Sequence, residues 1–191
     1  MNTRTWQVLL IGGASGVGKS TLAEQIARLY GVNLLRLDDV QVALERVTTP
    51  EQLPLLHFWR TNWDEFCAWS DEERRAHHLR VARTIYSPAV SAIITNHLEQ
   101  RDPVVLEGDY LLPELAVGNT HVRALFVLED EAQIAQNYLK REGEAQGFRA
   151  RTSAHLDGWL RQECARVGVP VLRASPWSSV LERAKEVLER H

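Results

Sequence analysis

Short apolar runs alternate with longer amphipathic stretches along this chain. The runs that are typical of buried strands cover residues 6–11, 33–37, 103–107, 122–128 and 169–172. Apolar residues three and four positions apart predict helices at 20–30, 130–141, 153–166 and 177–190. Strands that alternate with helices favour a parallel sheet covered on both faces, so we expect an α/β fold. Ligands of such sheets bind beyond the carboxyl ends of the strands, and candidate chemistry is sought there.

The segment between the second and third predicted strands is long and mainly helical. Pro50 and Pro54 interrupt it, and a kink is expected near Pro88 because proline removes a helical hydrogen bond. Residues 142–152 are polar, contain glycine, and are predicted to form a mobile loop. We therefore expect one domain over residues 1–191, with a helical, substrate-covering insert at 48–100 and a lid loop at 140–152.

Composition agrees with a single globular domain and narrows its partners. The chain has 191 residues, of which 45% are hydrophobic and 25% charged. Its formal net charge of -3 gives a nucleic-acid partner no electrostatic support. No stretch approaches the roughly 20 apolar residues of a membrane span, and no secretory leader is recognised. Cys67 and Cys164 form neither a zinc nor a disulfide pattern, so we expect a cytoplasmic protein with no membrane partner.

A complete phosphate-binding motif follows the first predicted strand. Residues 13–20 read G-A-S-G-V-G-K-S and match G-x-x-x-x-G-K-S/T. Its glycines let backbone N–H groups turn toward phosphate oxygens, and the next helix adds its positive end. Lys19 offers a charge to the β- and γ-phosphates, and the Ser20 hydroxyl can bind Mg²⁺. The predicted nucleotide-binding residues are Gly13, Ala14, Ser15, Gly16, Val17, Gly18, Lys19, Ser20 and Thr21.

Acidic residues follow the second and third predicted strands. Asp38 can reach the γ-phosphate region and accept a proton from a substrate hydroxyl; alternatively, Asp38 or Asp39 simply caps the next helix. Glu107 ends an apolar strand, which is the setting of a carboxylate that orients Mg²⁺ and its waters. Asp109 is a candidate to face the substrate. The alternative for this pair is an acid that caps the turn at Gly108.

Arginines bracket the predicted lid loop. Phosphoryl transfer spreads negative charge over the equatorial oxygens, and arginines that close over this charge stabilise it. Arg141, Arg149 and Arg151 are candidates for that task, and glycines in the loop can act as hinges. The alternative is an ordinary solvated loop, because Glu142 and Glu144 partly neutralise the arginines.

The predicted insert carries aromatic residues at helical spacing, namely Trp59, Trp63, Phe66 and Trp69. A stripe of this kind is typical of core packing more than of a ligand site, and we interpret it as core. Arg60 and Arg83 are candidates to bind an anionic substrate, with solvated surface arginine as the alternative.

These motifs together resemble the small P-loop kinases of the nucleoside-monophosphate, shikimate and gluconate kinase type. Residues 11–21 and 104–108 look closest to 2-phosphoglycerate-kinase-like proteins, with chloramphenicol phosphotransferases and zeta-toxin kinases as more distant relatives. The resemblance implies a P-loop NTPase three-layer sandwich with a five-stranded parallel sheet in the order 2-3-1-4-5. It also implies ATP as donor, Asp38 as the acid that activates the acceptor, and Trp177 near adenine. Relatives of this type are often monomers or homodimers.

The chain departs from the family pattern at one place. Such kinases usually carry an arginine one turn before the lid, where this sequence has Gln136 and Asn137. The leading hypothesis is an ATP- and Mg²⁺-dependent phosphotransferase that acts on a hydroxyl of a small molecule. The alternatives are an ATP-binding regulatory protein with little or no kinase activity, and a nucleoside or nucleotide kinase. Sugar, phosphoglycerate, antibiotic and nucleoside acceptors all remain open.

Overall fold

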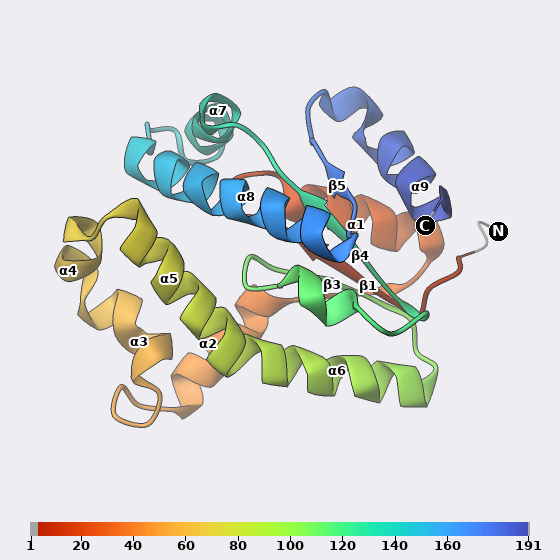
Figure 1. Cartoon of the computed structure of the whole chain (residues 1–191), viewed down its shortest axis with the longest axis horizontal. Coiled ribbons are helices and arrows are strands. Elements are labelled where there is room, and N and C mark those ends of the chain that lie inside the picture. The colour runs from red at the N-terminus through yellow and green to blue at the C-terminus, as the bar shows by residue number, and fades with distance from the viewer. Residues whose placement is uncertain (1–3, 191) are drawn as a thin grey trace.

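The computed structural model describes residues 4–190 and places a parallel sheet at the centre of the molecule (Figure 1). Its strands are β1 (Val8–Gly12), β2 (Asn33–Arg36), β3 (Val104–Glu107), β4 (Val122–Val127) and β5 (Val171–Leu172). The strand order is β2-β3-β1-β4-β5, and every pairing is parallel. The predicted fold class and strand order are therefore confirmed.

Helices cover both faces of the sheet, as right-handed crossovers require. The helices α1 (Lys19–Tyr30) and α9 (Val180–Arg190) contact each other on one face, where α1 lies against β3 and α9 against β4. The helices α6 (Ser87–Gln100) and α8 (Gly147–Val167) cover the other face. Because both faces are covered, β1 and β3 are buried along their whole length, which explains their unbroken apolar sequence.

The insert between β2 and β3 is helical, as the sequence predicts. It consists of α2 (Leu37–Val47), α3 (Pro54–Thr61), α4 (Trp63–Ala68), α5 (Asp71–Val81), a π-helical turn (Ala82–Tyr86) and α6. The kink expected near Pro88 occurs at this turn, where the chain changes direction between α5 and α6 (Figure 1). Proline has no N–H to donate to the preceding turn, which accounts for the irregularity just before it.

The predicted loop at 142–152 is mostly helix in the structure. α7 (Glu131–Glu142) continues to Glu142, and α8 begins at Gly147, so only residues 143–146 connect them. Gly143 ends α7 in a left-handed conformation with φ 78°. Polar composition alone suggested a loop, but Ala150 and Ser153 are buried against the protein and extend α8 toward its N-terminus. Residues 142–152 therefore form a helical corner, called here the α7–α8 corner.

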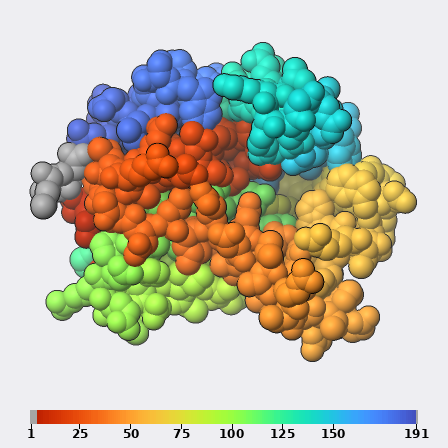
Figure 2. All heavy atoms as spheres, turned by 180° about the vertical axis from the view of Figure 1, so that it is seen from behind, coloured from red at the N-terminus to blue at the C-terminus, as the bar shows by residue number. Residues whose placement is uncertain are grey.

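The insert and the α7–α8 corner lie close together on the surface. Figure 2 shows the orange and yellow part of the insert and the cyan α7–α8 corner as neighbours on the same side of the molecule.

Between residues 4 and 190, none of the helices combines the length and the hydropathy needed to cross a membrane. A short 3₁₀ turn, Trp177–Ser179, leads into α9, where the sequence predicts a single helix from residue 177.

Candidate active site

The phosphate loop runs from the end of β1 to the start of α1. Gly13, Gly16 and Gly18 have φ values of 138°, 84° and 96°, which side chains with a Cβ rarely adopt. A Cβ at Gly13 would lie 2.2 Å from the carbonyl oxygen of Val127, so the loop is also packed tightly against β4. This backbone therefore requires glycine at the motif positions. Gly18 forms the N-cap of α1, which directs the positive end of that helix into the loop.

Lys19 and Ser20 converge on Glu107 at the end of β3. The Lys19 ammonium lies 3.6 Å from Glu107 Oε1, and the Ser20 hydroxyl donates a hydrogen bond of 3.0 Å to the same oxygen. Lys19 and Glu107 are both buried, at 8% and 3% exposure. Burial raises the pKa of Glu107, and Lys19 and Ser20 offset part of that rise. The phosphate loop and the third strand thus form one charged centre.

Asp38 and Asp109 line a cavity beside this centre. Both predicted aspartates after β2 lie in the first turn of α2, whose N-cap is Arg36, so neither Asp38 nor Asp39 is the N-cap. Burial raises the pKa of Asp38, Asp109 raises it further, and Lys19 opposes both effects. These couplings bring the acids after β2 and β3 into one electrostatic group with the phosphate loop.

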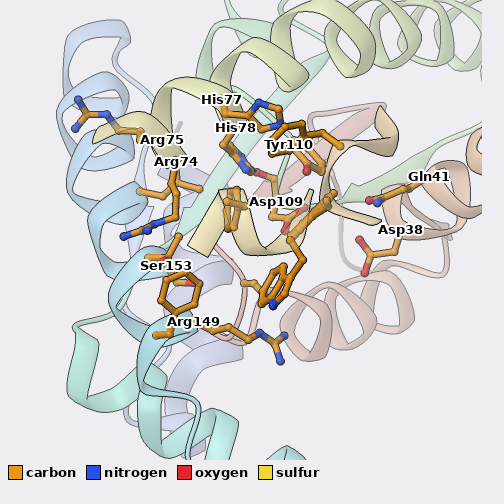
Figure 3. Close-up of a pocket in the computed structure, with 18 of the residues that line it drawn as sticks. Asp38, Gln41, Arg74, Arg75, His77, His78, Asp109, Tyr110, Arg149 and Ser153 are labelled. Carbon is orange, nitrogen blue, oxygen red and sulfur yellow. Dashed lines mark hydrogen bonds between the residues drawn. The ribbon is translucent and has the colours of Figure 1, made fainter. Parts of the chain in front are cut away.

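The cavity that contains Asp38 has a volume of about 320 Å³ and is called here the acceptor cavity. It reaches from Ser15 of the phosphate loop to the insert on one side and to α8 on the other (Figure 3). Its lining residues are Ser15, Asp38, Gln41, Phe58, Trp59, Trp63, Phe66, Arg74, Arg75, His77, His78, Asp109, Tyr110, Tyr138, Phe148, Arg149, Thr152, Ser153 and Leu156. The volume falls in the range of small-molecule sites, roughly 300–1,000 Å³.

A second cavity of about 670 Å³ also borders the phosphate loop. Gly16, Gly18, Lys19, Ser20 and Thr21 line it together with α7 residues Gln133, Gln136, Asn137, Lys140 and Arg141, and with Trp177. Trp177 packs directly over Gly18, where a Cβ would meet its ring at 2.0 Å. This cavity, called here the nucleotide cavity, has the loop amides, a flat aromatic ring and cationic side chains at one place.

The aromatic stripe of the insert is not core, contrary to our interpretation of the sequence. Trp59, Trp63 and Phe66 line the acceptor cavity, and Trp63 is 44% exposed. Their neighbour across the cavity is Phe148 of α8, whose ring centroid lies 6.2 Å from that of Trp63. Helical spacing reports which residues share a face, but it cannot report whether that face meets the sheet or a cavity.

The candidate arginines are divided between several places. Arg141 lines the nucleotide cavity and Arg149 the acceptor cavity, and their guanidinium groups lie 4.9 and 4.5 Å from the centroid of the Tyr138 ring. Both are paired with Glu142, at 2.6 and 2.8 Å. Among the described residues that line the two cavities, three predicted candidates are missing: Arg60, Arg83 and Arg151. Their nearest acids are Glu45 at 2.6 Å, Glu114 at 3.8 Å and Asp71 at 4.0 Å, respectively.

The sequence analysis missed Asp157, a buried carboxylate in the middle of α8. Its Oδ1 accepts a hydrogen bond of 3.2 Å from the amide of Ala14 in the phosphate loop, and its Oδ2 accepts one of 2.8 Å from the amide of Glu129 after β4. Burial raises the pKa of Asp157 to about 7, although both amides favour the charged form. A single aspartate within a predicted helix gives no signal in the sequence for such a contact.

Asn137, which with Gln136 occupies the stretch where an arginine was expected from the resemblance, contacts the phosphate loop. Its side-chain amide donates a hydrogen bond of 2.8 Å to the carbonyl oxygen of Gly16. α7 therefore contacts the phosphate loop through a neutral residue. Glu129, another buried acid, accepts hydrogen bonds of 2.7 Å from the amide and hydroxyl of Ser175 and holds the segment before Trp177.

Two histidines of α5, which were assigned no task from the sequence, line the acceptor cavity. Burial lowers the pKa of His77 to about 4 and also lowers that of His78, so both are neutral at pH 7. His78 donates through Nε2 to the carbonyl oxygen of Asp109 at 2.9 Å, and its ring stacks on Tyr110. Within residues 4–190, the buried Nδ1 of His77 has no hydrogen-bond partner.

Known proteins with similar sequences are named 2-phosphoglycerate kinase. The protein of Pyrococcus horikoshii is 23% identical over 180 residues, which is 86% of this chain and 58% of that protein. The protein of Methanopyrus kandleri is 28% identical over 138 residues, 71% of this chain and 35% of its own length. The chain thus spans between about a third and three fifths of the curated relatives it matches. Comparison with models of protein families gives no match.

Solved structures with a similar fold include kinases of small molecules. A gluconokinase from Sinorhizobium meliloti superposes with a TM-score of 0.61 at 21% identity, covering 98% of this chain and 94% of that one. The shikimate kinase from Acinetobacter baumannii gives a TM-score of 0.58 at 15% identity, covering 98% and 93%. The resemblance to the small P-loop kinases is therefore confirmed, and the fold is theirs.

Proposed function

We propose that this chain is an ATP- and Mg²⁺-dependent phosphotransferase that moves the γ-phosphoryl group to a hydroxyl of a small molecule. The observation that carries the proposal is that two cavities meet at the phosphate loop. The nucleotide cavity contains Lys19 and Ser20, and the acceptor cavity contains Asp38 and Asp109. A donor and an acceptor bound in these cavities face each other across the loop, as transfer between them requires.

The residues at the loop fit a nucleotide with its metal ion. Mg²⁺ in such sites is held by few protein groups and completes its shell with phosphate oxygens and waters. The Ser20 hydroxyl and the Glu107 carboxylate, 3.0 Å apart, are the groups that would hold it here. When bound, ATP would supply the γ-phosphoryl group, and Mg²⁺ would neutralise part of the negative charge of the phosphates. Lys19 and the loop amides hold the phosphates, and the ring of Trp177 is available to the base.

Asp38 is the residue that we assign to the acceptor hydroxyl. Its carboxylate accepts the hydroxyl proton, and its raised pKa makes it a stronger base than an ordinary aspartate. Arg141 and Arg149 both lie against the Tyr138 ring, and they stabilise the transferring group once they leave Glu142. The relatives, named 2-phosphoglycerate kinase, gluconokinase and shikimate kinase, support this class of reaction.

The test is ADP release from MgATP by the purified protein across a panel of hydroxyl-bearing metabolites. We expect at least one compound to stimulate ADP release by the unaltered protein and by the surface control Lys185→Ala, but not by Lys19→Ala. Flat turnover over the whole panel, with ATP binding demonstrated, would instead favour an ATP-binding regulatory protein. A monomer or homodimer in the cytoplasm, without a nucleic-acid partner, is the expected form of the active protein.

A further inference from the structure

The acceptor cavity also indicates what kind of molecule it holds. We infer that the acceptor carries a flat, largely apolar ring next to its reactive hydroxyl and bears at most one negative charge. The inference rests on the proposed kinase function for the reaction itself, but ring binding can be measured without turnover. An aryl-substituted diol or a nucleoside belongs to this class, whereas a short phosphorylated acid does not.

The first argument is the aromatic wall of the cavity. Trp59, Trp63 and Phe66 come from the insert, with ring centroids 5.3 to 6.0 Å apart, and Phe148 faces them from α8. Rings at such distances offer faces and edges on which another ring can stack. Because Trp63 is 44% exposed, a large apolar surface faces solvent until a ligand covers it.

The second argument is the state of the cavity's arginines. Arg74 lies 2.5 Å from Asp71, Arg75 lies 2.5 Å from Glu72, and Arg149 lies 2.8 Å from Glu142. Each cation therefore has a carboxylate partner. Arg74 also lies over the Phe148 ring at 4.8 Å and donates to the carbonyl oxygen of Trp69. Arg149 is already assigned to the transferring phosphoryl group, so a phosphate group of the acceptor would have to displace the carboxylate partner of Arg74 or Arg75.

The third argument is the remaining polar lining. His77 and His78 are neutral at pH 7, so they add no positive charge, and Asp38 and Asp109 add negative charge near the loop. An acceptor with both a phosphate and a carboxylate meets repulsion from these two carboxylates. His77 is 7% exposed, and its Nδ1 lacks a partner among the described residues. A neutral polar atom of the ligand can provide that hydrogen bond.

These features distinguish the cavity from one suited to 2-phosphoglycerate, the compound in the relatives' name. That molecule is small, lacks a ring and carries two acidic groups, so it needs unpaired cations more than aromatic faces. Figure 3 shows the labelled arginines on the α5 and α8 side of the cavity and Asp38 at the other end. The lining of this cavity therefore fits a ring-bearing acceptor better than a short acid with two charged groups.

The experiment combines binding with turnover on the same compounds. Titrations with a non-hydrolysable ATP analogue present follow tryptophan fluorescence and calorimetric heat. The ring-bearing probes are 1-phenyl-1,2-ethanediol, pyridoxine and adenosine, and the acyclic anions are 2-phosphoglycerate and gluconate. We expect at least one ring-bearing probe to bind more tightly than either anion. ADP release with MgATP is then measured for each probe.

Substitutions identify the site of binding. Trp63→Leu should weaken binding of the ring-bearing probe about tenfold or more, because it removes an aromatic face of the wall. Trp159→Leu is the matched control, since Trp159 is a half-buried tryptophan of α8 outside the lining, and binding should be unchanged. Affinity for the ATP analogue should be the same in both variants, which checks that each variant is folded.

The outcomes separate this inference from the proposed function. Ring binding that is weakened by Trp63→Leu, without ADP release for any compound, would support the cavity inference and count against the kinase proposal. ADP release with 2-phosphoglycerate or gluconate, and none with ring-bearing probes that also fail to bind, would support the kinase and overturn the inference. Failure of every ring-bearing probe to bind, or equal binding to Trp63→Leu, would likewise overturn it.

Discussion

Asp157 Oδ1 lies 3.2 Å from the backbone nitrogen of Ala14, so a carboxylate in the middle of α8 holds the phosphate loop. The other oxygen of the same side chain holds the amide of Glu129 at the end of β4. The helix that follows the α7–α8 corner is thereby tied to the loop that the nucleotide contacts. Asp157 is a positioning residue, because it acts through the loop backbone rather than on a ligand.

Replacing Asp157 by asparagine should loosen the phosphate loop. Asparagine has one acceptor oxygen for two amide donors, so one hydrogen bond is lost and one buried N–H is left unpaired. We expect the Kd for ATP to rise about tenfold, as the loss of one buried hydrogen bond implies. Calorimetric titration measures this. Glu163→Gln, on the same helix and away from the loop, is the control, and equal affinities in the two variants would contradict the assignment.

The same residue should make stability depend on pH. Asp157 has a folded pKa of about 7 against an ordinary value of 3.8. Between these values the native protein retains a proton that the unfolded chain has released, so its stability falls as pH rises, and the fall levels off above about pH 7. The slope is at most about 1.4 kcal/mol per pH unit.

Denaturant unfolding of the unaltered protein and of Asp157→Asn at pH 5, 6, 7 and 8 isolates this effect. The asparagine has no proton to release. The unfolding free energy of the unaltered protein minus that of Asp157→Asn should therefore decrease from about pH 5 to 7 and then stay constant. A difference that is independent of pH over this interval would show that Asp157 is ionised throughout, and a difference that increases would contradict the predicted direction.

Asn137→Ala tests whether α7 contributes to nucleotide binding without an arginine. The substitution removes the hydrogen bond to the carbonyl oxygen of Gly16, 2.8 Å long in the structure. The KM for ATP should rise roughly three- to tenfold, with little change in melting temperature, since a neutral hydrogen bond contributes about 1 kcal/mol. Leu139→Ala, at an exposed position of the same helix outside both cavities, should leave KM unchanged. An effect of the control as large as that of Asn137→Ala would refute the specific role.

Glu107→Gln should weaken the response to Mg²⁺. The substitution removes the carboxylate that accepts from Ser20 and pairs with the buried Lys19. We expect the Mg²⁺ concentration for half-maximal ADP release to rise about tenfold or more, because a neutral amide is a weaker ligand for a hard cation. Glu114→Gln, outside both cavities, is the control. A Mg²⁺ dependence unchanged in Glu107→Gln would exclude Glu107 from the metal site.

The parts of the molecule that follow local rules could be predicted from the sequence. The phosphate loop depends on glycine spacing and the strands on short apolar runs, and both signals are local in the chain. The strand order was implied by the resemblance to the small P-loop kinases. The contact between Asp157 and Ala14 joins residues 143 positions apart, so no local pattern reveals it. The aromatic stripe was predicted correctly as a helical face and wrongly as core, because burial depends on what packs across that face. The loop predicted at 142–152 is mostly helix for the same reason, since tertiary burial of Ala150 outweighs polar composition.

The central claim is that Asp38 activates the acceptor hydroxyl, and its neighbour offers a matched control. Asp38 and Asp39 lie in the same helical turn, but Asp38 lines the acceptor cavity and Asp39 is not among its lining residues. The decisive measurement is kcat for phosphoryl transfer, with an acceptor that stimulates ADP release, in Asp38→Asn and Asp39→Asn. We predict a loss of about 100-fold or more in Asp38→Asn with an unchanged KM for ATP, and a change of less than about threefold in Asp39→Asn. Equal activities in the two variants, or a larger loss in Asp39→Asn, would contradict the account.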